Sequence, residues 1–209
     1  LYAFGNENNK KWIIVDMGVS FADDSAPGID LIYPDPGFLL DKKDDLLGIV
    51  LTHAHEDHIG AIAHIWPQLN CDIYATPFTA ILVQEKFKEK KIDISNKIKI
   101  VKLDSEITLG PFKIDFVTLT HSILEPNGLS IQTPIGTILH TGDWKIDPNP
   151  LIGGNIDKEK LKAIGQKGVI AMICDSTNVL NPGRAGSELS VRESLLNIIS
   201  CLLYTSDAA

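Results

Sequence analysis

Three histidines and two acidic residues lie within six positions of one segment, LTHAHEDHIG, in a chain with six histidines in all. They are His53, His55, Glu56, Asp57 and His58. In an extended turn, residues two apart point the same way, so His53 and His55 could present two imidazoles to one ion. Imidazole and carboxylate groups together suit zinc or manganese. The spacing therefore predicts a metal site.

A second ion could lie beside the first. Asp57 and His58 follow where the chain enters a predicted helix, and they could face that second ion. Two ions roughly 3.5–4 Å apart can hold a bridging hydroxide, which attacks phosphorus or a carbonyl carbon at neutral pH. Further ligands must come from elsewhere in the chain, and His121 and Asp143 are candidates. A carboxylate between two metals is a suitable bridge, and Asp143 in HTGD is the best placed.

Each of these residues has an alternative role when taken alone. His121 could be a structural histidine, and Asp143 could be a turn residue after Gly142. Asp16, before a glycine turn, could be a capping group, but we expect it to orient a histidine ligand. Glu56 is expected to face solvent or to help shape the turn, and His64 is expected to support the ligands or to pack. His140 is expected to lie close to the site without touching a metal.

The unusual polar residues follow apolar strands. Strands are predicted at residues 11–15, 46–51, 99–103, 106–109, 112–119, 129–133, 137–140 and 169–174. Those at 11–15, 46–51 and 169–174 are predicted to be buried. Asp16, the histidine turn, His121, Asp143 and Asp175 each come just after one of these strands. Side chains at the ends of neighbouring strands can converge on one rim, where ligand sites tend to be built.

Helices are predicted between the strands. A helix begins at Asp57 and is stopped by Pro67, and Thr76 with Pro77 is typical of the start of a second helix that ends near residue 90. Residues 21–45 are rich in Pro, Gly and Asp and are predicted to be a loop.

A last helix is predicted near the C-terminus, with Ser190 and Glu193 at capping-box spacing. Val191, Leu195 and Ile198 would share one face of this helix. From Cys201 the composition changes abruptly, and residues 201–209 are interpreted as a foreign tail. The first residue is Leu1, so we expect the chain to be a fragment.

The composition is that of an ordinary globular chain, with 44% hydrophobic and 22% charged residues. No apolar run approaches the roughly 20 residues that a membrane helix needs, so no membrane association is expected. Three scattered cysteines favour a reducing compartment, and we predict a cytoplasmic protein. The net charge of −8 argues against binding nucleic acid by bulk electrostatics alone.

The pattern THAHEDH, with Asp16 upstream and His121 and Asp143 downstream, resembles the metallo-β-lactamase superfamily of binuclear hydrolases. The resemblance implies an α+β fold, the αββα four-layer sandwich. It also implies that His53, His55 and His121 bind one divalent metal, that Asp57 and His58 bind the other, and that Asp143 bridges them. The two ions would be zinc, with manganese as the alternative.

Longer motifs resemble the ribonuclease J family, bacterial ribonucleases of the β-CASP group. These motifs are VDMGVSF, LTHAHEDHIGAI, THSI, HTGDWKID and DSTNVLNPGRAGSE. The resemblance implies a metallo-β-lactamase domain over residues 1–180 and the start of a β-CASP domain over 181–200. It implies catalytic roles for Asp57, Asp143 and Asp175, of which Asp175 would partner a histidine of the later domain. Where many members read HSIPD this chain reads HSILE, so a different loop shape is expected after His121.

Three functional hypotheses follow. The first is a ribonuclease that cleaves single-stranded RNA as a 5′-to-3′ exonuclease with endonuclease capacity. The full-length parent protein would be a homo-oligomer. The second is another binuclear hydrolase, acting on a thioester or a small phosphodiester, which would share every ligand. The third is a catalytically silent RNA-binding subunit, for which loss of ligands would be the signature.

Overall fold

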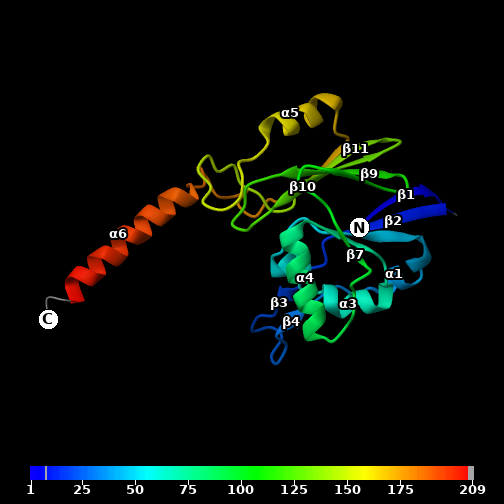
Figure 1. The fold of residues 1–209 in the computed structure, drawn as a ribbon, viewed down its shortest axis with the longest axis horizontal. Helices are drawn as coiled ribbons and strands as arrows, with labels where there is room; N and C mark the ends of the chain where they lie inside the picture. Colours follow the sequence, from blue (N-terminus) through cyan, green and yellow to red (C-terminus); the bar gives the residue numbers. More distant parts are fainter. Residues whose placement is uncertain (8, 207–209) are drawn as a thin grey trace.

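The computed structural model describes residues 1–7 and 9–206, and it arranges most of them around two five-stranded sheets (Figure 1). The first sheet contains, in spatial order, β1 (Tyr2–Asn6), β2 (Asn9–Val15), β5 (Leu46–Val50), β6 (Ile73–Ala75) and β7 (Ile98–Ile100). The second contains β12 (Ala171–Ile173), β11 (Gly136–His140), β10 (Asn127–Thr133), β9 (Phe112–Thr118) and β8 (Glu106–Leu109).

The two sheets differ in strand direction. In the first sheet β2, β5, β6 and β7 are parallel, and helices make the connections between β5, β6 and β7. In the second sheet β8 to β11 form an antiparallel meander, and β12 joins β11 in parallel. The strands predicted at 129–133 and 137–140 are confirmed as β10 and β11, which form an antiparallel hairpin. The strand LLGIV of β5 is continuously apolar because parallel central strands are covered on both faces.

Helices cover the outer face of each sheet, so the layers run helix, sheet, sheet, helix. The first sheet is covered by α3 (Ile62–Leu69) and α4 (Pro77–Glu89), the second by α5 (Lys158–Lys167). The layer between the sheets includes the buried residues Ile13, Val50, Phe112, Phe116, Leu129 and Ile131. The predicted αββα sandwich is therefore confirmed.

Helix α3 corrects one prediction. The helix predicted from Asp57 is two helices, α2 (Glu56–Ile59) and α3, because the Ala61 amide donates to Met17 O (3.0 Å) instead of continuing the helix. Pro67 does not stop α3 but lies inside it. Burial of Trp66 and a hydrogen bond from its indole to Cys71 O (2.7 Å) hold the last turn despite the missing amide.

Several other elements differ from the prediction. The strand predicted as buried at 169–174 is β12, whose residues are exposed because it is an edge strand paired only with β11. Residues 21–45, predicted to be a loop, are mostly irregular but contain three short elements. These are β4 (Leu31–Ile32), α1 (Gly37–Leu40) and the 3₁₀ helix η1 (Lys43–Asp45), and the segment begins with the second residue of β3 (Ser20–Phe21). Helix α5 was not predicted, since only Leu161 and Ile164 carry its apolar face.

The last helix, α6 (Glu188–Ser206), extends away from the sandwich (Figure 1). Ser190 lies inside α6 and not at its N-cap, because Ser187 Oγ accepts the Ser190 amide (3.2 Å). The helix passes Cys201 without a break, so its structure marks no boundary there. Residues 207–209 of the predicted tail lie outside the described residues.

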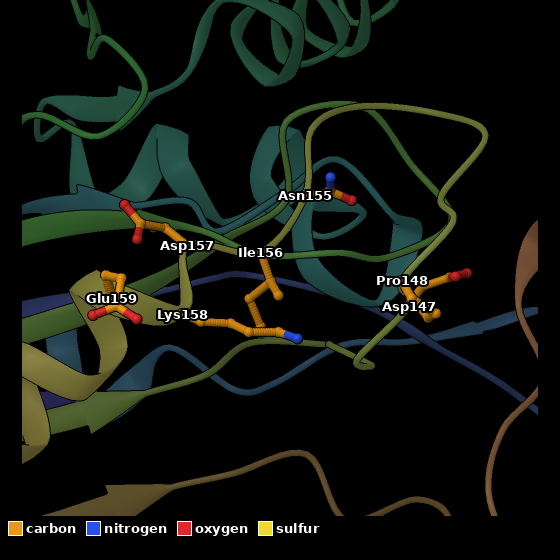
Figure 2. A pocket seen from close by; sticks show the side chains of 7 residues that line it. All are labelled: Asp147, Pro148, Asn155, Ile156, Asp157, Lys158 and Glu159. Atoms are coloured by element: carbon orange, nitrogen blue, oxygen red, sulfur yellow. The ribbon is translucent and has the colours of Figure 1, made fainter.

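The loop before α5 ties the sandwich to α6. Buried Asp147 accepts the Glu188 amide (2.8 Å), and Glu188 Oε2 accepts the Leu151 amide (2.8 Å). Burial by itself raises the pKa of Asp147, but hydrogen bonds from the Glu188 and Asn149 amides and from Lys145 outweigh it and lower that pKa. The same loop lines a hollow of about 440 Å³ beside α5 (Figure 2). None of the predicted metal ligands lines this hollow.

Candidate metal centre

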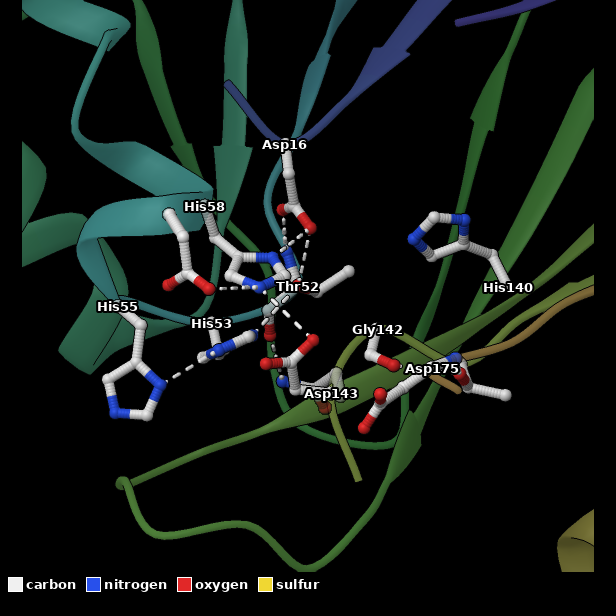
Figure 3. Close-up of polar contacts among 12 residues, drawn as sticks. Asp16, Thr52, His53, His55, His58, His140, Gly142, Asp143 and Asp175 are labelled. Carbon is white, nitrogen blue, oxygen red and sulfur yellow. Dashed lines mark hydrogen bonds and ion pairs between the residues drawn. The ribbon is translucent and has the colours of Figure 1, made fainter. Parts of the chain in front are cut away.

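The predicted site residues come from the ends of five strands, and they meet at one rim of the two sheets (Figure 3). Asp16 follows β2, the histidine turn follows β5, His121 follows β9, Asp143 follows β11 and Asp175 follows β12. The parallel direction of β2 and β5 brings Asp16 beside the histidine turn. The predicted convergence on one rim is confirmed.

Three histidines form the first group of the centre. His55 Nδ1 lies 3.1 Å from His53 Nε2 and 3.0 Å from His121 Nε2. Ring nitrogens of all three lie within 4.8 Å of one another, a spacing that could hold one metal ion. The turn thus supplies two of these rings and the distant His121 supplies the third.

A second group shares His53 with the first. It consists of His53, His58 and Asp143, again with ligand atoms within 4.8 Å of one another. Asp143 Oδ1 lies 3.2 Å from His58 Nε2, and Asp143 Oδ2 lies 3.8 Å from His121 Nε2. The Asp143 carboxylate therefore faces both groups, one oxygen toward each.

Asp57 lies at the margin of the centre. Its side chain is 63% exposed, and its Oδ2 is 3.7 Å from His58 Nε2. It belongs to neither group among the described residues, so its role as a ligand stays a prediction. The neighbouring Glu56 faces outward, as expected, and pairs with Lys86 (2.5 Å).

Asp16 holds His58 and Thr52 in place. Its Oδ2 contacts His58 Nδ1 (2.7 Å) and accepts the Thr52 hydroxyl (2.7 Å), while its Oδ1 accepts the Thr52 amide (2.8 Å). Asp16 has a φ of 59°, a left-handed conformation that aspartate tolerates better than most residues. The expectation that Asp16 orients a histidine is confirmed.

Thr52 is a residue that the sequence reasoning missed. Its Oγ1 lies 3.0 Å from His53 Nδ1, so it links Asp16 to the first group of histidines. The only signal was its position directly before His53, at the end of a buried strand. Contacts of this kind hold a ligand ring in one orientation.

The loops that carry His121 and Asp143 are fastened to each other. The Lys145 amide donates to Thr120 O (3.0 Å), and the Thr120 hydroxyl donates back to Lys145 O. These two bonds join the residue before His121 to the strand end that bears Asp143.

The departure from the family pattern after His121 also has a structural role. Glu125 Oε2 accepts the Phe78 amide (2.8 Å) at the N-terminus of α4, where a carboxylate complements the helix dipole. Glu125 itself has a φ of 55°. The loop is thereby attached to α4.

His140 and Asp175 lie near the centre but outside both groups. His140 Nδ1 contacts the Tyr2 hydroxyl (2.7 Å), a cross-sheet partner that the sequence did not reveal. His140 was expected not to bind metal, and it belongs to neither group among the described residues. Asp175 accepts the Thr177 amide (2.9 Å) and hydroxyl (2.8 Å).

The electrostatics of the two groups differ. Burial, together with the neighbouring histidines, lowers the pKa of His53 to about 2, so its ring is neutral and keeps a lone pair for a ligand. Burial lowers the pKa of His58 as well, but the hydrogen bond to Asp16 and the charges of Asp16, Asp143 and Asp57 outweigh it and raise that pKa. The carboxylates around His58 therefore favour positive charge at the second group.

This donor set fits a divalent cation. It comprises imidazoles from His53, His55, His58 and His121 and the carboxylate of Asp143. Neutral imidazole and carboxylate are ordinary ligands of zinc and other transition metals. The centre is therefore compatible with divalent metal binding.

Comparisons with known proteins agree with this centre. Residues 11–162 match the model of the beta-lactamase superfamily domain. Among curated relatives, ribonuclease J of Sinorhizobium meliloti (strain Sm2011 / Rm2011 / 2011) is 45% identical over 200 residues, which cover 96% of this chain and 36% of that protein. Ribonuclease J of Helicobacter pylori (strain ATCC 700392 / 26695) is 39% identical over 186 residues, covering 88% of this chain and 27% of that protein. The chain thus spans about a third of the length of these relatives or less.

Solved structures share the fold at low sequence identity. Zn(2+)-bound PqqB from Methylobacterium extorquens has a TM-score of 0.53 at 12% identity, with 81% of this chain and 57% of that chain covered. A diphosphatase from the PhnP family has a TM-score of 0.50 at 16% identity, with the same coverage. Among the described residues, no helix is both long and apolar enough to cross a membrane.

Proposed function

The chain belongs to the β-lactamase superfamily, and on that premise we propose that it is the metal-binding part of a ribonuclease that hydrolyses phosphodiester bonds of single-stranded RNA. The closeness to curated ribonucleases J over nearly the whole chain supports this substrate. The proposed activity is 5′-to-3′ exonucleolytic with endonuclease capacity. The proposed parent is a cytoplasmic homo-oligomer.

We propose that two divalent cations bind, zinc in preference to manganese. His53, His55 and His121 would hold one ion, Asp57 and His58 the other, and Asp143 would bridge them. When bound, such a pair supplies a water activated at neutral pH and neutralises charge on the phosphate.

The chain's own residues orient these groups. Asp16 and Thr52 fix the rings of His58 and His53 through their Nδ1 atoms, which leaves each Nε2 directed toward the other ligands. Asp175 would act with a histidine beyond this chain to assist the leaving group. Residues 1–180 would form the metallo-β-lactamase-like domain, residues 181–200 would begin the β-CASP domain, and 201–209 would be a foreign tail.

The observation that carries the two-metal part of the proposal is the position of Asp143 between the two ligand groups, and the similarity to ribonucleases J carries the choice of RNA as substrate. The test is a hydrolysis panel on the full-length natural protein after metal loading, with labelled single-stranded RNA and a thioester as substrates. The proposal expects RNA cleavage that is lost in the His53→Ala, His55→Ala double variant. Thioester hydrolysis with intact RNA would favour a different hydrolase, and RNA binding without turnover in the wild type would favour a silent subunit.

A further inference from the structure

An open hollow of about 360 Å³ adjoins the metal centre at Asp57. Its walls are the turn after β2, residues 18–20, and the segment at the end of β4, which includes Tyr33 and Pro34. No residue of this wall takes part in the hydrogen bonds that orient the histidines. The hollow is therefore separate from the residues that orient the histidines, and it opens beside the candidate metal ligand Asp57.

Tyr33 supplies an aromatic ring to one side of this hollow. The Tyr33 ring stacks on His64 of α3, with ring centroids 5.3 Å apart and planes 28° from parallel. The Tyr33 residue is nevertheless 47% exposed. Within residues 1–7 and 9–206 its hydroxyl has no hydrogen-bond partner, so the ring is held by stacking and remains accessible.

Two lysines act on the His64 ring. Burial lowers the pKa of His64, and the ammonium groups of Lys90, the residue after α4, and of Lys86 on α4 lower it further. Lys86 is paired with Glu56. Lys90 is exposed and has no ion pair among the described residues.

Exposed aromatic rings beside cations are the elements with which proteins bind single-stranded nucleic acid. Bases stack on the rings, and the cations attract the phosphates. The chemistry of a thioester or a small phosphodiester requires no base, whereas every nucleotide of an RNA strand carries one. The arrangement therefore complements a nucleotide chain better than these alternative substrates.

Resting on the proposed ribonuclease function, we propose that Tyr33, supported by His64, stacks on a base of the RNA strand whose phosphate lies at the metal centre. This makes Tyr33 a substrate-binding residue. It acts on affinity for base-bearing strands, and the chemistry of the metal centre is independent of it.

The test compares two probes of equal length and charge. One is a fluorescent oligouridylate, whose bases stack little on each other, and the other is the same strand without bases. Dissociation constants are measured by anisotropy on the full-length natural protein, with a chelator present to prevent cleavage. Tyr33→Ala should weaken binding of the oligouridylate about tenfold and leave binding of the abasic strand unchanged.

Two further variants control for folding and for the ring. Tyr33→Phe keeps the stacking surface and should bind both strands as the wild type does. Phe38→Ala removes another exposed ring, on α1, which packs against Trp12 and not His64, and it should change neither constant.

The outcomes separate this inference from the proposed function. Unchanged oligouridylate binding by Tyr33→Ala, or an equal loss for both strands, would overturn the stacking site alone. Failure of the wild type to bind any oligouridylate would overturn the ribonuclease proposal and the stacking site together.

Discussion

Asp143 Oδ1 lies 3.2 Å from His58 Nε2, and its Oδ2 lies 3.8 Å from His121 Nε2. His58 belongs to the turn after β5 and His121 to the end of β9, so this carboxylate joins groups from the two different sheets. A metal centre built in this way depends on the packing of the sheets as much as on the histidine turn.

Asp16→Asn should weaken metal binding about tenfold to a hundredfold while the fold stays intact. Asparagine tolerates the left-handed φ of 59° at this position, so the change removes mainly the negative charge beside His58 Nδ1. Competition with a chelating dye measures the affinity. Asp23→Asn is the control, because among the described residues the Asp23 carboxylate accepts hydrogen bonds only from Ser25, on the surface. Equal affinities for the two variants would contradict the role of Asp16.

Gly18→Ala should destabilise the protein by about 3 kcal/mol, as expected for overpacking against backbone. A Cβ at Gly18 would lie 1.6 Å from Asp57 O, where the turn after β2 passes the histidine turn. Urea denaturation measures the loss. Gly154→Ala, which meets nothing within 4 Å, should be close to neutral, and a similar small effect at Gly18 would refute the close approach.

Glu125→Ala should cost about 1 kcal/mol, because it leaves the Phe78 amide at the start of α4 without its acceptor. Glu125→Gln keeps an acceptor oxygen and should cost less. Thermal unfolding compares the two variants with Glu85→Ala, an exposed acid on α4 that should change stability little. Equal stability of all three variants would show that Glu125 does not hold the loop.

Cys71 should resist a thiol reagent at pH 8 until the protein unfolds, while exposed Cys201 reacts at once. Burial raises the pKa of the Cys71 thiol from 9.0 to about 11. The neutral thiol therefore contributes stability below pH 9, and that contribution is lost as the pH rises toward about 11. Timed labelling with and without urea checks this, and fast labelling of Cys71 in the native protein would contradict its burial.

Local patterns were sufficient to predict much of this structure. The apolar run of β5 and the H-x-H-x-D-H spacing are contiguous in sequence, and so were recognisable without the fold. The helix break at Ala61 was not, because it depends on a hydrogen bond to the distant Met17. Exposure of β12 likewise depends on which strands cover it, a property of the sheet order and not of its sequence.

The residues that support the metal centre could not be predicted from the sequence for the same reason. Thr52 and Tyr2 have ordinary sequence surroundings, and their roles come from partners 36 and 138 positions away. Asp57 shows the converse, since a residue in the strongest part of the pattern lies at the exposed margin of the centre.

The most direct test of the metal centre is the metal content per purified chain, measured for the wild type and for Asp143→Ala. The structure predicts about two divalent ions in the wild type and a clear loss in the variant, because Asp143 faces both ligand groups. Equal metal content in the two proteins, or a folded wild type that binds no metal at all, would contradict a centre bridged by Asp143.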